Sequence, residues 1–329
     1  MSVPVVLAVD LGGTKLASAL FTESGQVVHK KVAPLAGRVG REVGALVCQQ
    51  IQSLLAECGQ KGRVPRALGV SVPGIAYAAS GRVWAPNIPG WEEYPLLEEI
   101  ESLPGVSALA VRIDSDRAAY ILGETWQGVA KGCRNAVFLA VGTGIGAGIL
   151  VDGQVLRGHR DIAGAIGWLA LDRPYRQEYK ACGCFEYYAS GAGVARLARE
   201  LLAGEPDYRG PLREKPVELL GAPDVFAAFT AGDRLAARVF DECISFWGMA
   251  VANLVSLFNP EMIVFGGGVF GPGVQFLDRI AEEARRWAQP ISITQVRIAA
   301  STLGGEAGLY GAARLAWQAA TTTTTPRNP

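Results

Sequence analysis

The sequence lacks any excess of charge of one sign. Its 329 residues carry 31 basic and 31 acidic side chains, so the formal net charge at pH 7 is zero. Proteins that bind nucleic acid or anionic membranes through charge carry a clear excess of lysine and arginine. We therefore expect no nucleic-acid partner and no membrane partner, and a small molecule is the better expectation.

A membrane-spanning segment is also missing. The apolar stretch "VFLAVGTGIGAGILVDG" is uncharged from Asn135 to Val151, which is shorter than the roughly 20 residues that a spanning helix needs. Its alternate glycines would each cost a helix about 1 kcal/mol. At the start of the chain, "MSVPVVLAVDLGGTK" has no basic segment and Asp10 interrupts its apolar run, so it is a poor secretory signal.

The cysteines do not form the spaced pattern of a disulfide framework. Four of the six are scattered on expected helices or loops, and no secretory leader precedes them, so reduced thiols and a cytoplasmic location fit best. The six are Cys48, Cys58, Cys133, Cys182, Cys184 and Cys243.

Glycine is abundant, with 41 residues that cluster at the ends of apolar runs. A dinucleotide-binding loop needs a helix directly after the glycines, whereas "GTGIGAGILVDGQVL" continues as a strand to the hairpin signal Asp152-Gly153. "DLGGTKLASALFTESGQ" has the same layout of strand, glycine turn, strand and turn. Either hairpin alone could be only a tight β-turn, but together they favour a pair of phosphate-binding hairpins.

The order of elements predicts a duplicated α/β unit with a cleft between its halves. We expect an N-terminal α/β domain over residues 1–114, completed by a C-terminal helix at 305–319, and a C-terminal α/β domain over 115–304. Within the second domain we expect strands as far as Leu171 and one helix over Glu186–Leu202. The low-complexity tail, residues 320–329, is expected to be disordered.

From about Val5 to Ala316 the motifs resemble those of the ROK family (repressors, unassigned frames and kinases), within the actin and hexokinase superfamily. "DLGGTK" and "VGTGIGAGI" resemble its phosphate motifs, "APNIPGW" its sugar-side loop, "NPEMIVFGGGV" its adenosine-binding segment and "STLGGEAGLYGAA" its closing helix. The resemblance implies a two-domain actin-like ATPase (ribonuclease H-like) fold, ATP and Mg²⁺ as cofactors, a sugar or polyol substrate and a homodimer. Few residues precede the first phosphate motif, where the family's repressors carry a DNA-binding helix-turn-helix, so we do not expect a repressor.

The resemblance also implies the catalytic residue. The family pattern Asn-Asp-x-Asn precedes a Gly-Glu pair, and counting back from Gly123 and Glu124 places Asp116 at the catalytic position. Ser115 and Ala118 then replace the two asparagines. Phosphoryl transfer needs an aligned hydroxyl, a proton acceptor and neutralised charge. Asp116 would orient the hydroxyl and accept its proton, although it could instead be only a helix cap.

Further site residues follow from the same resemblance. Asp10 would hold Mg²⁺, through water, or could be only a turn former, and Lys15 could add charge or be merely solvated. The nucleotide would be bound by Asp10, Gly12, Gly13, Thr14, Lys15, Gly142, Thr143, Gly144, Gly266, Gly267 and Gly268. The substrate would contact Gly74, Asn87, Ser115, Asp116, Trp168 and Glu186.

The sequence departs from the family at a sugar-side motif. Where the family has Ala-Gly-Glu-(Ile/Leu)-Gly-His, this chain reads "AGAIGW", with Ala165 for the glutamate and Trp168 for the histidine. The family's zinc-binding cysteines are also largely replaced, since Gln177 and Tyr179 stand at the first two positions. We therefore predict no zinc site, and expect apolar packing to fill that space through Trp168, Phe185 and Tyr187.

These departures bear on the substrate. A site that has lost hydrogen-bonding groups holds a fully hydroxylated sugar edge less tightly, whereas an indole can stack on a sugar face. We expect a substituted, deoxy or amino sugar, or a cyclitol, to be preferred over plain glucose. A sugar sensor without catalysis remains the alternative. An ATPase or chaperone of the superfamily is weaker, because "APNIPGW" and Glu186 would have no obvious use there.

Overall fold

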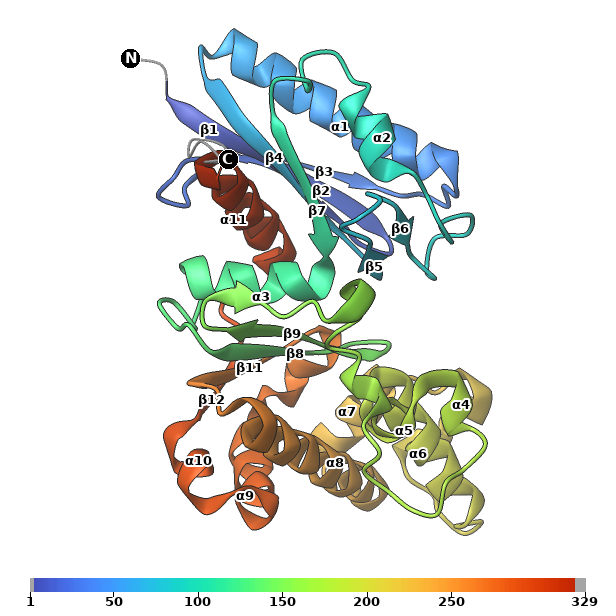
Figure 1. The fold of residues 1–329 in the computed structure, drawn as a ribbon. Coiled ribbons are helices and arrows are strands. Elements are labelled where there is room, and N and C mark those ends of the chain that lie inside the picture. The colour runs from blue at the N-terminus through green and yellow to red at the C-terminus, as the bar shows by residue number, and fades with distance from the viewer. Residues whose placement is uncertain (1–2, 323–329) are drawn as a thin grey trace. The chain divides into compact units, whose positions relative to one another are not determined.

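A computed structural model describes residues 3–322, and the chain divides into two compact units (Figure 1). Unit 1 contains the chain up to Gly132, the segment Val155–Ala163 and the chain from Thr302 onward. Unit 2 contains Cys133–Gln154 and Gly164–Ser301. The tail expected to be disordered lies outside the described residues from 323 onward, whereas residues 320–322 continue the last helix.

Unit 1 is built on a five-stranded mixed sheet with the strand order β3-β2-β1-β4-β7. The first three strands form an antiparallel meander, and the other two run parallel to β1. The strands are β1 (Pro4–Leu11), β2 (Lys15–Phe21), β3 (Val27–Pro34), β4 (Val64–Val72) and β7 (Ala110–Ser115), with a separate ribbon of β5 (Ile75–Ala76) and β6 (Val83–Trp84).

Alternation along β1 divides its side chains between two cores. Val5 and Val9 pack in the core that includes helix α1 (Arg41–Gln60), whereas Val6 and Ala8 pack in the core that includes helix α11 (Ala307–Thr322). Successive side chains of a strand point to opposite faces. Asp10, next in the even series, therefore faces the side of the sheet that α11 covers.

Helix α3 (Asp116–Gln127) packs directly on α11 through glycines. A Cβ on Gly123 would lie 2.5 Å from the carbonyl oxygen of Ala307, and one on Gly311 would lie 1.8 Å from that of Ala119. This backbone contact makes α3 part of unit 1. We expected the boundary near Asp114, and the structure places it after Gly132, because α3 packs on α11. A further short helix of unit 1 is α2 (Leu96–Glu101).

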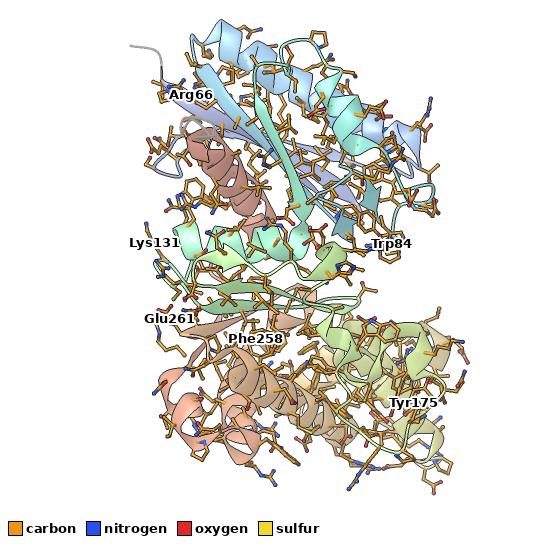
Figure 2. All side chains as sticks on the ribbon, in the orientation of Figure 1. Arg66, Trp84, Lys131, Tyr175, Phe258 and Glu261 are labelled. Carbon is orange, nitrogen blue, oxygen red and sulfur yellow. The ribbon has the colours of Figure 1, made fainter. Side chains whose placement is uncertain are left out.

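Unit 2 repeats the same sheet order, as β10-β9-β8-β11-β12. Its strands β8 and β9 pair antiparallel, which confirms that the stretch from 137 to 153 is a hairpin. Glu261, labelled in Figure 2, accepts hydrogen bonds from the backbone of Arg134 and Asn135 and so fixes the start of the β8–β11 pair. The strands are β8 (Ala136–Val141), β9 (Ile145–Val151), β10 (Gln154–Val155), β11 (Met262–Gly266) and β12 (Arg297–Ala300).

The helices of unit 2 pack mainly in one large core with β8 and β11. They are α4 (Tyr179–Cys182), α5 (Cys184–Ala189), α6 (Gly191–Ala203), α7 (Ala222–Thr230), α8 (Arg234–Phe258), α9 (Leu277–Trp287) and α10 (Pro290–Gln295). Among residues 3–322, no helix combines the length and the apolar character needed to cross a bilayer.

Two expectations for unit 2 were wrong. The single helix expected over Glu186–Leu202 is two helices, because Ser190 leaves the helical conformation and its side chain accepts a hydrogen bond from Gly193 N as the N-cap of α6. The strands expected as far as Leu171 end at β10. Beyond it lie short 3₁₀ turns at His159–Asp161 and Ile166–Trp168.

Candidate functional site

Asp10 lies near the end of β1 in unit 1, against the first turn of α11. Gly308 makes this approach possible, since a Cβ there would lie 2.5 Å from Oδ1 of Asp10. The carboxyl is partly accessible but enclosed by protein on most sides, and this burial raises its pKa to about 6. The nearby charges of Asp116 and Glu306 raise the pKa further, whereas Ser71 and Lys15 lower it.

Asp116 is the first residue of α3, directly after β7. Its Oδ1 accepts a hydrogen bond from the backbone N–H of Arg117 at 2.8 Å, and the hydroxyl of Tyr120 donates to Oδ2 at 3.4 Å. Burial raises the pKa of this carboxyl to about 6, and the positive charge of Arg117 partly opposes the shift. A carboxylate with such a pKa can accept a proton near neutral pH. Asp10, Asp116 and Tyr120 therefore form one group of interacting polar side chains in unit 1.

The residues just before Asp116 are held by the surrounding chain. Ser115 is buried and caps α3, since its Oγ accepts a hydrogen bond from Ala118 N at 3.3 Å. Asp114 is also buried and forms an ion pair with Arg157, which belongs to the segment Val155–Ala163. The structure therefore shows Ser115, for which we expected a substrate contact, acting as the cap of α3.

A cavity of about 370 Å³ in unit 1 brings together three of the expected site residues. Gly13 and Thr14 of the first glycine turn line it with Asn87, beside the loop of residues 35–39. Gly12 closes the same turn, with its N–H donating to Lys15 O at 2.9 Å.

Gly74 lies at a position where only glycine fits. Its φ is +103°, and a Cβ there would lie 2.2 Å from Trp84 O. A weak contact of 3.5 Å joins its carbonyl to Arg117 Nη2, so the backbone at Gly74 neighbours the start of α3.

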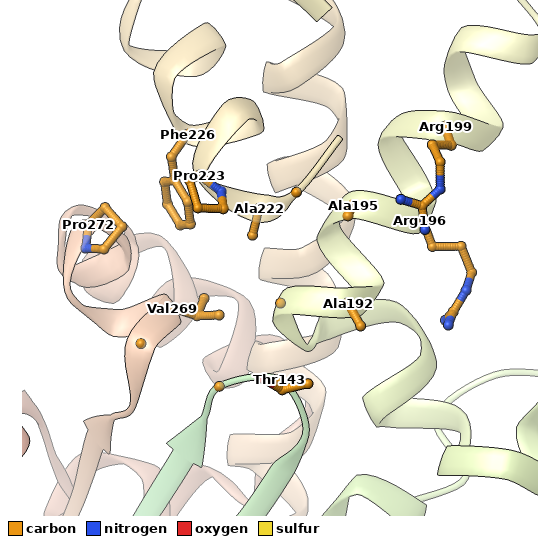
Figure 3. A pocket seen from close by; sticks show the side chains of 14 residues that line it. Thr143, Ala192, Ala195, Arg196, Arg199, Ala222, Pro223, Phe226, Val269 and Pro272 are labelled. Atoms are coloured by element: carbon orange, nitrogen blue, oxygen red, sulfur yellow. The ribbon is translucent and has the colours of Figure 1, made fainter. Parts of the chain in front are cut away.

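Unit 2 contains a cavity of about 650 Å³ at the turn of its glycine hairpin (Figure 3). Phe226 and Pro223 of α7 line one side with Pro272, and Arg196 and Arg199 of α6 line the other. The lining also includes Gly142, Thr143, Gly191, Ala192, Ala195, Gly221, Ala222, Gly268 and Val269. Apolar walls with a few polar groups are typical of small-molecule binding sites.

The expected nucleotide glycines of unit 2 divide into two groups. Gly142 and Gly268 line the cavity, and a Cβ on either would meet no other atom within 4 Å. Gly266 and Gly267 are explained by packing, because Cβ atoms there would lie 2.2 Å from the Phe138 ring and 2.4 Å from Val141 O. Gly144 also belongs to the packing group, because it lies against the carboxylate of Glu186.

Glu186 lies on α5 next to the glycine turn. Its Oε2 accepts a hydrogen bond from Ile145 N at 2.6 Å, and a Cβ on Gly144 would lie 2.7 Å from the same oxygen. Burial raises the pKa of this carboxyl, while the bond from Ile145 and the charge of Arg196 lower it.

The apolar filling expected near α5 was only partly right. Phe185 and Tyr187 are buried, but Trp168 is 57% exposed, because its turn packs through backbone against Gly183 and leaves the indole outside. The hydroxyls of Tyr179 and Tyr188 bond to each other and to Asp172, so polar contacts supplement the apolar packing.

Among residues 3–322, no three histidine, cysteine or acidic side chains are grouped as metal ligands would be. The six cysteines, all within that range, are free thiols.

Sequence reasoning missed the groups around the two aspartates. Tyr120 is four residues after Asp116, the helical spacing that places two side chains on one face. Ser71 is opposite Asp10 in the β1–β4 register, and both lie near the carboxyl ends of parallel strands. Glu306 offered no such signal, because its proximity to Asp10 depends on how α11 packs.

Comparison with known proteins identifies the family. The model of the ROK family matches residues 6–319 of this chain. The chain belongs to the ROK family. A glucokinase of Halalkalibacterium halodurans is 33% identical over 313 residues, which cover 93% of this chain and 92% of that protein.

Other ROK relatives differ in their described roles. A ROK family glucokinase from Streptomyces griseus, solved in complex with glucose and AMPPNP, superposes with a TM-score of 0.74 at 28% identity, covering 95% of this chain and 99% of that one. A putative xylose repressor of Caldicellulosiruptor is 28% identical over 322 residues, 94% of this chain and 77% of that protein. This chain therefore has the α/β fold of ROK kinases, within a family that also contains regulators.

Proposed function

We propose that this protein is an ATP-dependent kinase that phosphorylates a hydroxyl of a sugar or a sugar-like polyol. The observation that carries the proposal is Asp116, an enclosed carboxylate with a pKa of about 6 that interacts with Asp10 and Tyr120. A general base works best with a pKa close to the working pH. The named activities of the kinase relatives support the same assignment.

In this proposal Asp116 orients the acceptor hydroxyl and takes its proton. The hydroxyl oxygen bonds to the terminal phosphorus of ATP as the bond to the departing ADP oxygen breaks. The proton passes to Asp116 and the phosphoryl group to the acceptor. Asn87 and Glu186 would hold other hydroxyls of the substrate. Gly74 would contribute backbone, and the Ser115 hydroxyl can still donate a hydrogen bond while it caps α3.

The nucleotide would occupy the cavity of unit 2. Phe226 and the prolines beside it suit a purine base, and the turn with Gly142 and Thr143 suits phosphates. Gly268 would allow close approach of the ligand. The complex of the Streptomyces griseus relative with AMPPNP supports ATP as the nucleotide. Residues 13–15 of the first hairpin would contact the terminal phosphates.

The residues around Asp10 suit Mg²⁺ bound to the triphosphate. Mg²⁺ is usually held by one or two carboxylates together with phosphates and waters, so a larger cluster of protein ligands is not required. Asp10 is an enclosed carboxylate whose ionisation is opposed by the nearby Asp116 and Glu306, and a cation would relieve that repulsion. When bound, the ion would neutralise charge that develops on the phosphates.

We propose that plain glucose is not the best acceptor. Ala165 and Trp168 replace two hydrogen-bonding residues of the family motif, and each missing group can cost about 1–3 kcal/mol of binding. The exposed indole of Trp168 is free to stack on a sugar face or on a substituted carbon. A substituted, deoxy or amino sugar, or a cyclitol, fits this site better.

A coupled assay of ADP release, run with Mg²⁺ and ATP over a panel of sugars and cyclitols, tests the proposal. We expect at least one acceptor with a higher kcat/KM than glucose. Asp116→Ala should lose about 10²- to 10⁴-fold in kcat while it binds AMPPNP as the wild type does. Binding of a sugar without turnover of any acceptor would instead favour the sensor alternative.

The family resemblance supports a homodimer, and the free cysteines fit a cytoplasmic location. Size-exclusion chromatography with light scattering would measure the mass of the assembly, and the expected value is twice the chain mass of 34.7 kDa.

A further inference from the structure

The segment from α5 to the start of α6 holds the glycine turn of unit 2 at two points. At one end of the turn, Oε2 of Glu186 accepts the hydrogen bond from Ile145 N at 2.6 Å. At the other end, the N–H of Gly191 donates to Gly142 O at 2.8 Å. Inside the turn, Gly142 N donates to Gly144 O at 2.9 Å. The turn conformation is therefore fixed by the chain around residues 186–191.

Glycines make the contact with Glu186 possible on both sides. A Cβ on Gly144 would lie 2.7 Å from Oε2, and a Cβ on Gly167 would lie 3.0 Å from the same atom. The carboxylate is thus enclosed by two backbone segments, and a side chain at either glycine would force it to shift.

The same turn lines the nucleotide cavity. Gly142 and Thr143 face the cavity, and Arg196, whose charge lowers the pKa of Glu186, lines it from α6. The backbone conformation that Glu186 stabilises is consequently the one that a phosphate would meet.

We propose that Glu186 is a positioning residue of the nucleotide site, and that it couples the substrate side of unit 2 to the phosphate-binding turn. The inference rests on the proposed function, which places ATP in this cavity. The turn uses one carboxylate oxygen, and the other can bind a substrate hydroxyl. A substrate that orders Glu186 then also orders the turn, so each ligand tightens the binding of the other by the same factor.

Binding of AMPPNP with Mg²⁺ and without any sugar, measured by isothermal titration calorimetry, tests this role. Glu186→Ala removes the acceptor for Ile145 N and should weaken AMPPNP binding about tenfold or more. Glu186→Gln keeps an oxygen that can accept this bond, so its affinity should stay within about threefold of the wild type. If Glu186 only contacted the sugar, neither substitution would change the affinity for AMPPNP.

Two further variants control for misfolding of Glu186→Ala. Gly144→Ala introduces a methyl group against Oε2 and should weaken AMPPNP binding in the same direction while Glu186 remains present. Glu178→Ala removes an exposed carboxylate just before α4 that pairs with Arg176, and it should leave the affinity unchanged.

The outcomes separate this inference from the proposed function. Wild-type affinity in both Glu186→Ala and Gly144→Ala would overturn the inference, even if the wild type phosphorylates a sugar. A wild type that does not bind AMPPNP would overturn both. Weaker binding in Glu186→Ala and Gly144→Ala, with recovery in Glu186→Gln, would establish the positioning role.

Discussion

Asp10 and Asp116 each stand in surroundings that oppose their negative charge. The pKa of each is raised to about 6, first of all by burial. For the proposed reaction this is useful, because a weakly acidic carboxyl is a better proton acceptor than an ordinary one. The same surroundings make the charged form costly at neutral pH.

The first prediction concerns Tyr120, whose hydroxyl lowers the pKa of Asp116. The base must be ionised to work, so kcat/KM of the wild type should fall as the pH drops through about 6. Tyr120→Phe removes the hydrogen bond to the charged form, raises the pKa and should move this acid limb to higher pH, by about half to one unit. The pH profile of kcat/KM is the measurement. Tyr175→Phe changes an exposed tyrosine and should not move the limb.

The second prediction concerns stability. The folded-state pKa of Asp116 lies above the unfolded value, so its contribution is most favourable below the unfolded pKa and is lost as the pH rises through about 6. Asp116→Asn removes the charge and should stabilise the fold at pH 7.5 by about 1–2 kcal/mol, after allowance for partial solvent access. At pH 5, which lies between the unfolded value of 3.8 and the folded value of about 6, the gain should be about half as large. Urea unfolding at both pH values measures this, and an equal effect at both would contradict it.

At the scale of helices, the position of Asp116 depends on how α3 meets α11. The two helices touch through Gly123 and Gly311, where no side chain could be accommodated. The same α11 carries Gly308 against Asp10. Helix α11 therefore contacts the surroundings of both aspartates of unit 1, through Gly311 at α3 and through Gly308 at Asp10.

The third prediction tests that contact. Gly311→Ala would place a Cβ 1.8 Å from Ala119 O, so the helices must separate, at a cost of about 2–3 kcal/mol in the free energy of unfolding. Gly59→Ala is the matched control in α1, where nothing lies within 4 Å of the added atom. It should be neutral or stabilise the helix by up to about 1 kcal/mol. Urea titrations of the two variants measure the difference, and equal stabilities would refute the close contact.

At the scale of the whole molecule, the two units share one sheet order, with an antiparallel meander followed by two parallel strands. This repetition was predictable, because each meander is encoded locally by a strand, a glycine turn and a second turn signal. The boundary of the units was not, since the assignment of α3 depends on its contact with α11, a helix far away in the sequence.

The candidate site was predictable to a similar extent. Asp10 and Asp116 follow from motifs at strand ends, where the chain itself sets the geometry. The sequence analysis missed Tyr120, although its helical spacing from Asp116 indicates a shared face. It also missed the enclosure of Glu186. The exposure of Trp168 was missed because an apolar residue was assumed to be buried, whereas its backbone rather than its indole makes the packing contact.

The fourth prediction concerns the segment Val155–Ala163, which returns to unit 1 and pairs Arg157 with the buried Asp114. Arg157→Met would leave that carboxylate unpaired and should destabilise the protein by about 2 kcal/mol at pH 7.5, less than a fully buried pair would because Arg157 is partly exposed. Burial already raises the pKa of Asp114, and loss of Arg157 raises it further, so the penalty should shrink at pH 5. Urea unfolding at the two pH values measures this change.

The double variant Arg157→Met with Asp114→Asn is the control for this pair. It removes both charges and should recover most of the lost stability. No recovery would mean that Arg157 acts through packing rather than through its charge.

The chain passes from one unit to the other after Gly132, Gln154, Ala163 and Ser301. As a consequence, no single cut in the polypeptide, whether by a protease or by splitting the gene, produces two fragments that each hold a whole unit. A fragment ending at residue 132 would keep the first sheet but expose the face that α11 covers, so we expect neither half to be a self-sufficient product of such a cut.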